Sequence, residues 1–263
     1  MLINQGELTT RTQLVGLAQK LKHTLSNSLG IHERRRFRGS FSDHAEAIDA
    51  VRSGAMAGYD NNEIAQVSFE EMCKVSIWDY PIIYWLGQLL QGQTRLIDAG
   101  GHMGTKFRAF TPFLALPAAF DWAILDVPAV VRAGRELAQK EGIKALTFYD
   151  RAEDLPESEV LLASGLFQYL DESPSDFLAR LKRKPQHFLI NKVATREGPD
   201  VVTLERFPGA EVPYQVRNRA AFERDIKSAG YFVRDQWIIP SISRHHKAFG
   251  HMTSRGYYLE LGE

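Results

Sequence analysis

Three scarcities limit what this chain of 263 residues can be. It has one cysteine, Cys73, so it can form neither an intrachain disulfide nor a zinc–thiolate cluster, and a reducing cytoplasm fits. It has no apolar run near the roughly twenty residues that span a bilayer, so membrane insertion is not expected. Its 32 basic and 32 acidic residues balance, so no general attraction to nucleic acid is indicated.

Two segments near the start of the chain bear on its location and on its possible partners. Residues 1–22 mix charged residues among the apolar ones, which does not resemble a signal peptide and favours a cytoplasmic location. The basic run over residues 33–38 is interpreted as a solvated helix end or loop. The alternative is a contact with an anionic partner or a membrane surface.

The first part of the chain, residues 1–92, is predicted to be all-helical. Leucines recur at helical spacing over residues 8–29, and Asp43 is placed to cap a second helix, with Glu46 completing a capping box. Further helices are expected over residues 62–75 and 80–90, the last with Pro81 in its first turn.

Residues 93–263 show a different pattern, in which short apolar runs alternate with amphipathic stretches. The pattern predicts a mostly parallel sheet with helices on both faces. Strands are expected at 96–98, 122–125, 146–149, 160–164, 187–192, 231–239 and 256–261, and helices from 105 and at 129–141, 174–181 and 218–229. The last two strands are close enough in sequence to pair as a hairpin.

The strongest functional signal lies directly after the first of these strands. An acid and three glycines follow in order, namely Asp98, Gly100, Gly101 and Gly104, and a helical pattern begins at Thr105. Glycines tolerate positive φ and let a ligand lie against bare backbone. This arrangement is typical of a nucleotide-binding turn, with an ordinary strand-to-helix turn as the alternative.

A second acid helps to choose the ligand. Asp126 ends the next strand, where a carboxylate can accept bonds from both hydroxyls of an adenosine ribose. Asp98 lies before the glycines, where it can bind the methionyl ammonium of S-adenosylmethionine. A dinucleotide, which needs backbone amides for its pyrophosphate, has no comparable need for charge at that position.

These motifs resemble those of class I S-adenosylmethionine-dependent methyltransferases. Residues 98–104 are similar to the first motif, and Leu125–Pro128 to the second motif in its small-molecule O-methyltransferase form. The order agrees from about Leu96 to Asn191. Pro213–Tyr214 and residues 229–232 resemble a family of bacterial putative methyltransferases associated with polysaccharide gene clusters.

The resemblance implies an α/β fold with a Rossmann-like seven-stranded sheet that ends in an antiparallel hairpin. It implies that S-adenosylmethionine is the cofactor, that S-adenosylhomocysteine is its product, and that the methyl group goes to a small-molecule acceptor, most readily at oxygen. By the same analogy the helical part would act as a cap that helps to build the acceptor pocket or pairs two subunits.

The expected cofactor contacts follow from the resemblance and from the rule that ligands bind beyond the carboxyl ends of the strands. They are Asp98, Gly100, Gly101, His102, Gly104, Asp126, Val127, Asp150, Arg151 and Ser164. A turn cap is the alternative role for Asp150. The expected acceptor contacts are Trp78, Tyr84, Gln168, Tyr169, Asn191 and Tyr214, with Glu205 and Arg206 beside them. Packing of the cap is the alternative for Trp78 and Tyr84.

The catalytic base is the least determined feature. Plant-type O-methyltransferases carry a histidine after the fourth strand, but Phe167 stands at the matching position here. His245 and His246, with His251 nearby, lie in a predicted loop that can fold over the site, and they are the candidate bases, with a structural role as the alternative. Adjacent side chains usually point apart, so no metal site is predicted.

Two other functions remain open from the sequence. One is an NAD-linked oxidoreductase, which is disfavoured because no tyrosine–lysine pair follows the fourth strand at helical spacing. The other is a catalytically inactive methyltransferase-like protein that serves in binding or assembly. The sequence does not choose between hydroxyl, carboxylate and amine acceptors.

Overall fold

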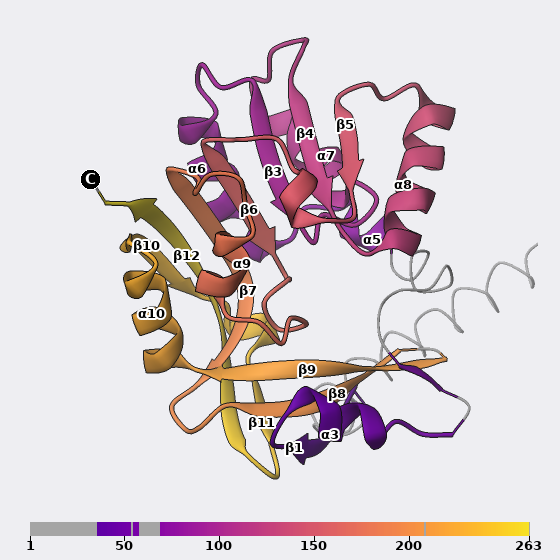
Figure 1. The fold of residues 1–263 in the computed structure, drawn as a ribbon, viewed down its shortest axis with the longest axis vertical. Coiled ribbons are helices and arrows are strands. Elements are labelled where there is room, and N and C mark those ends of the chain that lie inside the picture. Colours follow the sequence, from indigo (N-terminus) through magenta and orange to yellow (C-terminus); the bar gives the residue numbers. More distant parts are fainter. Residues whose placement is uncertain (1–35, 54, 58–68, 208, 263) are drawn as a thin grey trace, which may run out of the picture.

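The computed structural model describes residues 36–53, 55–57, 69–207 and 209–262 (Figure 1). The helix expected over residues 8–29 and the first part of that expected over 62–75 lie outside these ranges. Within the described residues, no helix is long and apolar enough to cross a bilayer.

Seven strands of the main sheet lie side by side in the order β5-β4-β3-β6-β7-β12-β10. They are β5 (Leu146–Tyr149), β4 (Asp121–Leu125), β3 (Arg95–Ala99), β6 (Val160–Ser164), β7 (His187–Arg196), β12 (Gly250–Leu261) and β10 (Tyr231–Ile238). The first five are parallel to one another, whereas β12 runs antiparallel to both β7 and β10. The predicted sheet with its antiparallel end is confirmed.

Helices cover both faces of this sheet, as the alternating pattern predicts. One buried cluster joins the strands to α6 (Tyr80–Leu89), α7 (Thr105–Phe110) and α8 (Pro128–Glu141). A second cluster, on the other face, joins them to α9 (Pro174–Ala179) and α10 (Arg219–Ser228). Strands enclosed on both faces are apolar throughout, and every residue of β6 is accordingly buried.

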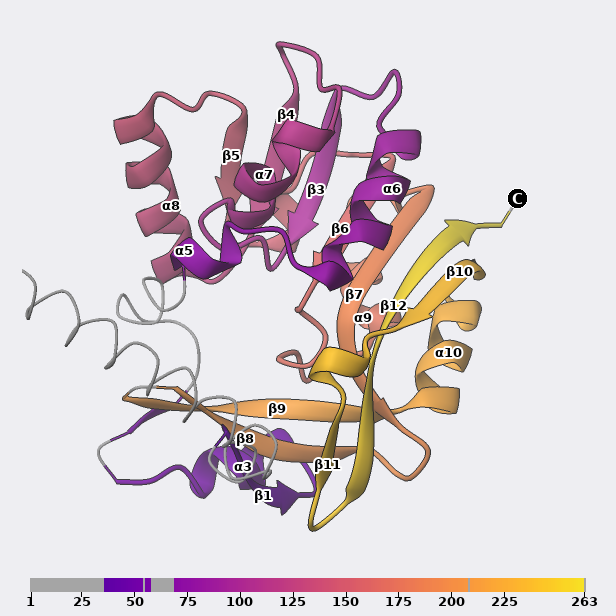
Figure 2. The ribbon, with the colours of Figure 1, turned by 180° about the vertical axis from the view of Figure 1, so that it is seen from behind.

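A second group of strands extends from the far end of β7, where Thr195 and Arg196 pair with β9 (Ala210–Asn218). Next to β9 lie β8 (Val201–Phe207) and then β1 (Phe37–Phe41), while the short β2 (Met56–Ala57) pairs with β9. Figures 1 and 2 show β8 and β9 crossing below the ends of β3 and β4. We call β1, β8 and β9 the side sheet.

The side sheet corrects the prediction that residues 1–92 are all-helical, because β1 and β2 belong to it. The predicted helix after Asp43 is confirmed as α3 (His44–Asp49). Asp43 caps this helix by accepting from the Glu46 backbone N–H at 2.8 Å. The Glu46 carboxylate accepts from the Ser42 backbone N–H at 2.8 Å rather than from that of Asp43, so the predicted capping box is not completed. Helix α6 begins next to Pro81 as predicted, and a short α5 (Phe69–Met72) packs near α7.

Candidate functional site

The glycine turn between β3 and α7 has the backbone geometry that its sequence predicts. Gly100 and Gly104 adopt φ values of 72° and 80°, in the left-handed region that favours glycine. The Gly100 N–H donates to the Leu125 carbonyl at 2.8 Å, which joins the turn to the end of β4. A Cβ on Gly104 would lie 2.7 Å from Leu146, so no side chain fits there without a shift.

Asp98 lies directly beneath this turn and is 1 % exposed. Its Oδ2 accepts a hydrogen bond from the Trp122 indole at 2.9 Å, and a Cβ on Gly101 would lie 2.8 Å from its carboxyl carbon. Its Oδ1 is buried and has no partner in the described part of the chain. Burial raises the pKa of Asp98 to about 7, because the charged carboxylate has lost its water.

Asp126 follows β4, and its side chain accepts hydrogen bonds from backbone N–H groups, one of which belongs to the glycine turn. Its Oδ2 accepts from the His102 N–H and its Oδ1 from the Val127 N–H, both at 2.8 Å. A carboxylate has about four acceptor positions, and these two bonds use one on each oxygen. The structure therefore brings Asp98, the glycines and Asp126 together at one edge of the sheet, as the sequence predicts.

His102 contributes its backbone to the turn, while its ring packs against α5. It has a left-handed φ of 55° and is 8 % exposed, and its ring stacks on Phe69 of α5 with the centroids 6.2 Å apart. Burial lowers the pKa of His102 to about 4, so the ring is neutral at physiological pH. A cofactor contact through this ring remains a prediction.

The end of β6 and the turn that follows it add further polar groups. Ser164 Oγ and Gln168 Oε1 are buried without a hydrogen-bond partner among the described residues, as are Asp98 Oδ1 and His102 Nδ1. Buried polar atoms in proteins are nearly always paired. Four unpaired atoms at the ends of β3 and β6 therefore fit a ligand that supplies an ammonium group and hydroxyls.

Other predicted contacts are used differently or face solvent. Asp150 is exposed at the end of β5, and Arg151 is exposed with ion pairs to acidic residues of the following turn. Asn191 is engaged at both ends of its amide, donating to the Trp78 carbonyl and accepting from the Trp237 indole, each at 3.1 Å. Tyr84 is 60 % exposed on α6. No feature of these side chains assigns them to the cofactor or acceptor.

Three predicted acceptor contacts do come together on the side sheet. Tyr169 donates its hydroxyl proton to Glu205 at 2.5 Å, and its ring meets that of Tyr214 edge to face with the centroids 5.5 Å apart. Glu205 is 1 % exposed and also accepts from Arg36 Nε at 2.7 Å. Arg206 lies on the same strand and forms an ion pair with Glu211.

The predicted bases lie elsewhere. His245 is exposed and His246 stacks on Phe249 at 4.1 Å, both on β11 (Arg244–His246), which the sequence had indicated as a loop. Both ribbon views place β11 at the level of the side sheet, away from the ends of β3 and β4 (Figures 1 and 2). The structure does not bring these histidines to the glycine turn. The described residues contain no cluster of His, Cys, Asp and Glu able to hold a metal ion.

Sequence reasoning missed two lysines at this edge of the sheet. Lys106, in the first turn of α7, donates to both carboxylate oxygens of the fully buried Asp79 at 2.9 and 3.0 Å. Lys192 follows Asn191 on β7, and burial lowers its pKa to about 8. The rule that selected Asn191 as a strand end is the one signal that could have found Lys192, which is one residue further along.

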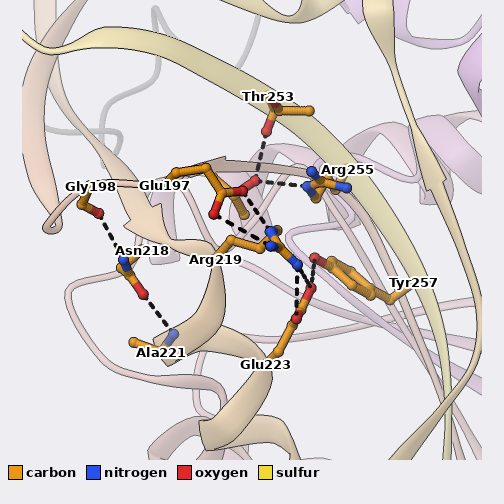
Figure 3. Close-up of polar contacts among 10 residues, drawn as sticks. Glu197, Gly198, Asn218, Arg219, Ala221, Glu223, Thr253, Arg255 and Tyr257 are labelled. Atoms are coloured by element: carbon orange, nitrogen blue, oxygen red, sulfur yellow. Dashed lines mark hydrogen bonds and ion pairs between the residues drawn. The ribbon is translucent and has the colours of Figure 1, made fainter.

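The outer end of β7 holds a contrasting polar cluster around Arg219 (Figure 3). Arg219 pairs with Glu197 at 2.7 Å and with Glu223 at 3.3 Å, and the Tyr257 hydroxyl also bonds to Glu223. A nearby hollow of about 240 Å³ is lined by Thr195, Arg196, Glu197, Gly198, Phe249, His251 and Thr253. It does not border the glycine turn, so the candidate site is defined by the strand ends and their unpaired groups.

No family model and no curated protein sequence matches this chain. Among solved structures, it is similar to the N-terminal domain of EvdMO1 with SAH bound, at 13% identity and a TM-score of 0.50, over 72% of this chain and 83% of that one. It is also similar to OxaC in complex with SAH and oxaline, at 16% identity and a TM-score of 0.50, over 78% of this chain and 52% of that one. The chain thus spans about half the length of OxaC.

Five parallel strands with an antiparallel end agree with the sheet that the resemblance implies, whereas the position of β12 between β7 and β10 was not predicted. The chain has the Rossmann-like methyltransferase fold.

Proposed function

We propose that this protein is an S-adenosylmethionine-dependent methyltransferase that acts on a small molecule, at oxygen. The single observation that carries the proposal is Asp98, a fully buried carboxylate beneath the glycine turn. One of its oxygens has no partner among the residues that the structure describes, and its pKa is raised to about 7. A buried carboxylate is stable in its charged form only with a cationic partner. The ammonium group of S-adenosylmethionine supplies such a charge.

The residues that would hold the cofactor follow from their positions. Asp98 would receive the ammonium, Asp126 the ribose hydroxyls, and the backbone of Gly100 and Gly101 would lie against the ligand. Ser164, with its unpaired hydroxyl, faces the same edge of the sheet. The bound cofactor supplies a methyl group that is already activated on a sulfonium, so the protein contributes mainly alignment and exclusion of water.

The acceptor would lie toward the side sheet. The half-buried Tyr169 and the buried Tyr214 and Glu205 form a partly aromatic surface there, which suits a small molecule with an apolar ring and hydroxyl groups. Gln168, with its unpaired carbonyl oxygen, lies in the turn between this surface and the end of β6. Oxygen is the proposed acceptor atom because a hydroxyl benefits from a nearby proton acceptor, and the Lys192 amine, whose pKa is lowered to about 8, lies at this edge.

Calorimetric titration with SAH tests the cofactor assignment directly. We expect one SAH to bind per chain with micromolar affinity and NADH not to bind. Binding of NADH in place of SAH would support the oxidoreductase alternative, and binding of neither would contradict the proposal. Transfer of label from methyl-labelled S-adenosylmethionine to the small-molecule fraction of a cell extract then separates an active enzyme from an inactive binding protein.

A further inference from the structure

An irregularity in the sheet sets the direction of Lys192. Strands β7 and β12 pair in register at Val193↔Arg255 and at Ile190↔Tyr257, so Asn191 and Lys192 together lie opposite the single residue Gly256. Two residues opposite one is a β-bulge, a feature that turns a side chain to a new direction and often occurs beside active sites.

The bulge is held firmly by its neighbours. The amide of Asn191 binds the Trp78 carbonyl on one side and the Trp237 indole on the other. Gly256 is required because a Cβ there would lie 2.1 Å from the Trp237 ring. Lys192 has a φ of 63°, a left-handed conformation that is uncommon for a residue with a long side chain. Backbone strain of this kind gathers at functional sites.

The bulge directs the lysine to the candidate site. A Cβ built on Gly165, the first residue after β6, would lie 3.1 Å from Lys192 Cε and 3.2 Å from its Nζ. The same position is 3.4 Å from the Gln168 amide nitrogen. The amine therefore lies over the end of β6, where Ser164 and Gln168 have unpaired polar atoms.

The charges around Lys192 leave it without a partner. The charged groups that face it are Lys106 and Asp79, Asp98 beneath the glycine turn, and Arg36 beside the side sheet. Lys106 is paired with Asp79, and Arg36 with Glu205. In the ranges that the structure covers, the Lys192 amine has no hydrogen bond or ion pair. Of these charged groups, the Asp98 carboxylate and the Lys192 amine are the two that have no ion pair within the described residues.

We propose that Lys192 Nζ accepts the proton that a hydroxyl acceptor loses during methyl transfer. This inference rests on the proposed function. The acceptor's O–H proton moves to the lone pair of the amine as the oxygen forms its bond to the methyl group and the bond between that methyl group and sulfur breaks. The positive charge that the cofactor carries on its sulfonium thus passes to Lys192, whose amine becomes an ammonium. The ammonium then releases its proton to water.

The protonation behaviour of Lys192 agrees with this role. Burial and the neighbouring Lys106 lower its pKa to about 8, against the opposing effects of Asp79 and Asp98. A base whose pKa lies near the working pH combines a usable neutral fraction with a useful affinity for the proton. Near neutral pH the neutral amine is therefore within reach at little cost, which is not so for an exposed lysine.

The first test measures the amine without any turnover. Competitive acylation of the intact protein with acetic anhydride across a pH series, read by mass spectrometry, gives the pKa of each reactive lysine. We expect Lys192 to titrate near 8. An ordinary lysine pKa for Lys192 would overturn the proposal and would favour a fixed cation that binds an anionic acceptor.

The second test uses Lys192→Gly, because glycine fits the left-handed backbone and keeps the bulge. We expect SAH affinity to stay within a few-fold of wild type, methyl transfer to extract acceptors to fall about 100-fold or more, and the rise in rate toward pH 8 to vanish. Added methylamine should restore part of the rate, which a purely structural lysine would not allow. Lys140→Met serves as the control and should match wild type.

The two proposals fail in different ways. If wild-type protein does not bind SAH, the methyltransferase proposal is contradicted. If it binds SAH and transfers methyl groups while Lys192→Gly keeps both its rate and its pH profile, the role of Lys192 is contradicted alone.

Discussion

Two polar clusters of this protein differ in how fully their groups are paired. Around Arg219, at the outer end of β7, the carboxylates of Glu197 and Glu223 both pair with the guanidinium (Figure 3). At the glycine turn, Asp98 and three other residues keep buried polar atoms unpaired, and Lys192 has no partner among the described residues. Paired polar groups stabilise a fold, whereas unpaired buried groups cost free energy and persist where a ligand completes them.

The glycine-turn region also contains one buried ion pair in which both charges are satisfied. This pair can be compared with the unpaired Asp98 in the same surroundings. Lys106 and Asp79 are both buried and bind each other through two hydrogen bonds. Asp98 lies nearby and its carboxylate is equally buried, but it forms no ion pair with any described residue. The difference predicts opposite effects on stability when each residue is neutralised.

Lys106→Met should have the largest effect. It leaves the Asp79 carboxylate buried without its cation, and we expect it to lower the free energy of unfolding by about 3–5 kcal/mol. Chemical denaturation measures the change. The matched control is Lys74→Met, which breaks a lysine–glutamate pair at 2.6 Å that is exposed on both sides and should leave the unfolding midpoint nearly unchanged. Equal effects in the two variants would contradict the argument from burial.

Asp98→Asn should reduce SAH affinity about 100-fold while making the free protein more stable. A pKa raised by about three units corresponds to up to about 4 kcal/mol, a cost that asparagine does not carry. Because the folded pKa lies above the unfolded one, this cost grows from pH 4 to pH 7 and is then constant. Differential scanning fluorimetry should therefore show a gain in Tm that is absent near pH 4 and complete above pH 7.

The control for this substitution is Asp235→Asn. Asp235 also accepts an indole N–H, from Trp85 at 2.9 Å, but it lies on β10 away from the strand ends. SAH affinity should not change in this variant. A similar loss of affinity in both variants would show that the effect of Asp98 is indirect.

The pH dependence of binding sharpens the same comparison. Below pH 7 the free Asp98 carboxyl is protonated and must lose its proton to pair with an ammonium. SAH affinity should therefore fall about tenfold for each pH unit below 7 and be flat just above it. Titration calorimetry between about pH 5 and pH 8 measures this slope. The slope should disappear in Asp98→Asn, and a flat wild-type profile would contradict the assignment of Asp98.

Arg219→Gln should have the smallest effect, because its cluster is near the surface and makes no contact with the glycine turn. Exposed ion pairs contribute about 0–1 kcal/mol, so the Tm should change by no more than about 2 °C. SAH affinity should equal that of wild type. A loss of affinity here would show that the two clusters are coupled through β7.

The main sheet could be predicted from the sequence because its signals are local. The bounds of β5 and β6 match the prediction to the residue, since each is a short apolar run between turn residues. The glycine turn follows from backbone geometry, which glycine alone satisfies at Gly100 and Gly104. Asn218 caps α10 as expected, through a 2.7 Å bond from the Ala221 N–H.

The side sheet could not be predicted in this way. Strands β8 and β9 bury Glu205 and Glu211, which interrupt the apolar pattern of a core strand. These carboxylates are neutralised by Arg36, Arg38 and Arg52 from a distant part of the chain, and by Arg206 on β8 itself. No strand was predicted over these residues, because only pairing across the sheet makes the burial of their charges acceptable.

The sequence by itself determined which segments form the main strands, the glycine turn and the two acids that meet there, because these depend on local backbone preference and on the common edge of parallel strands. The tertiary structure alone decided which polar groups find partners. It paired Lys106 with Asp79 and Arg36 with Glu205, left Asp98 incomplete, and turned Lys192 over the end of β6 through a bulge opposite Gly256. Hydrogen bonding and desolvation of these groups depend on segments far apart in the chain.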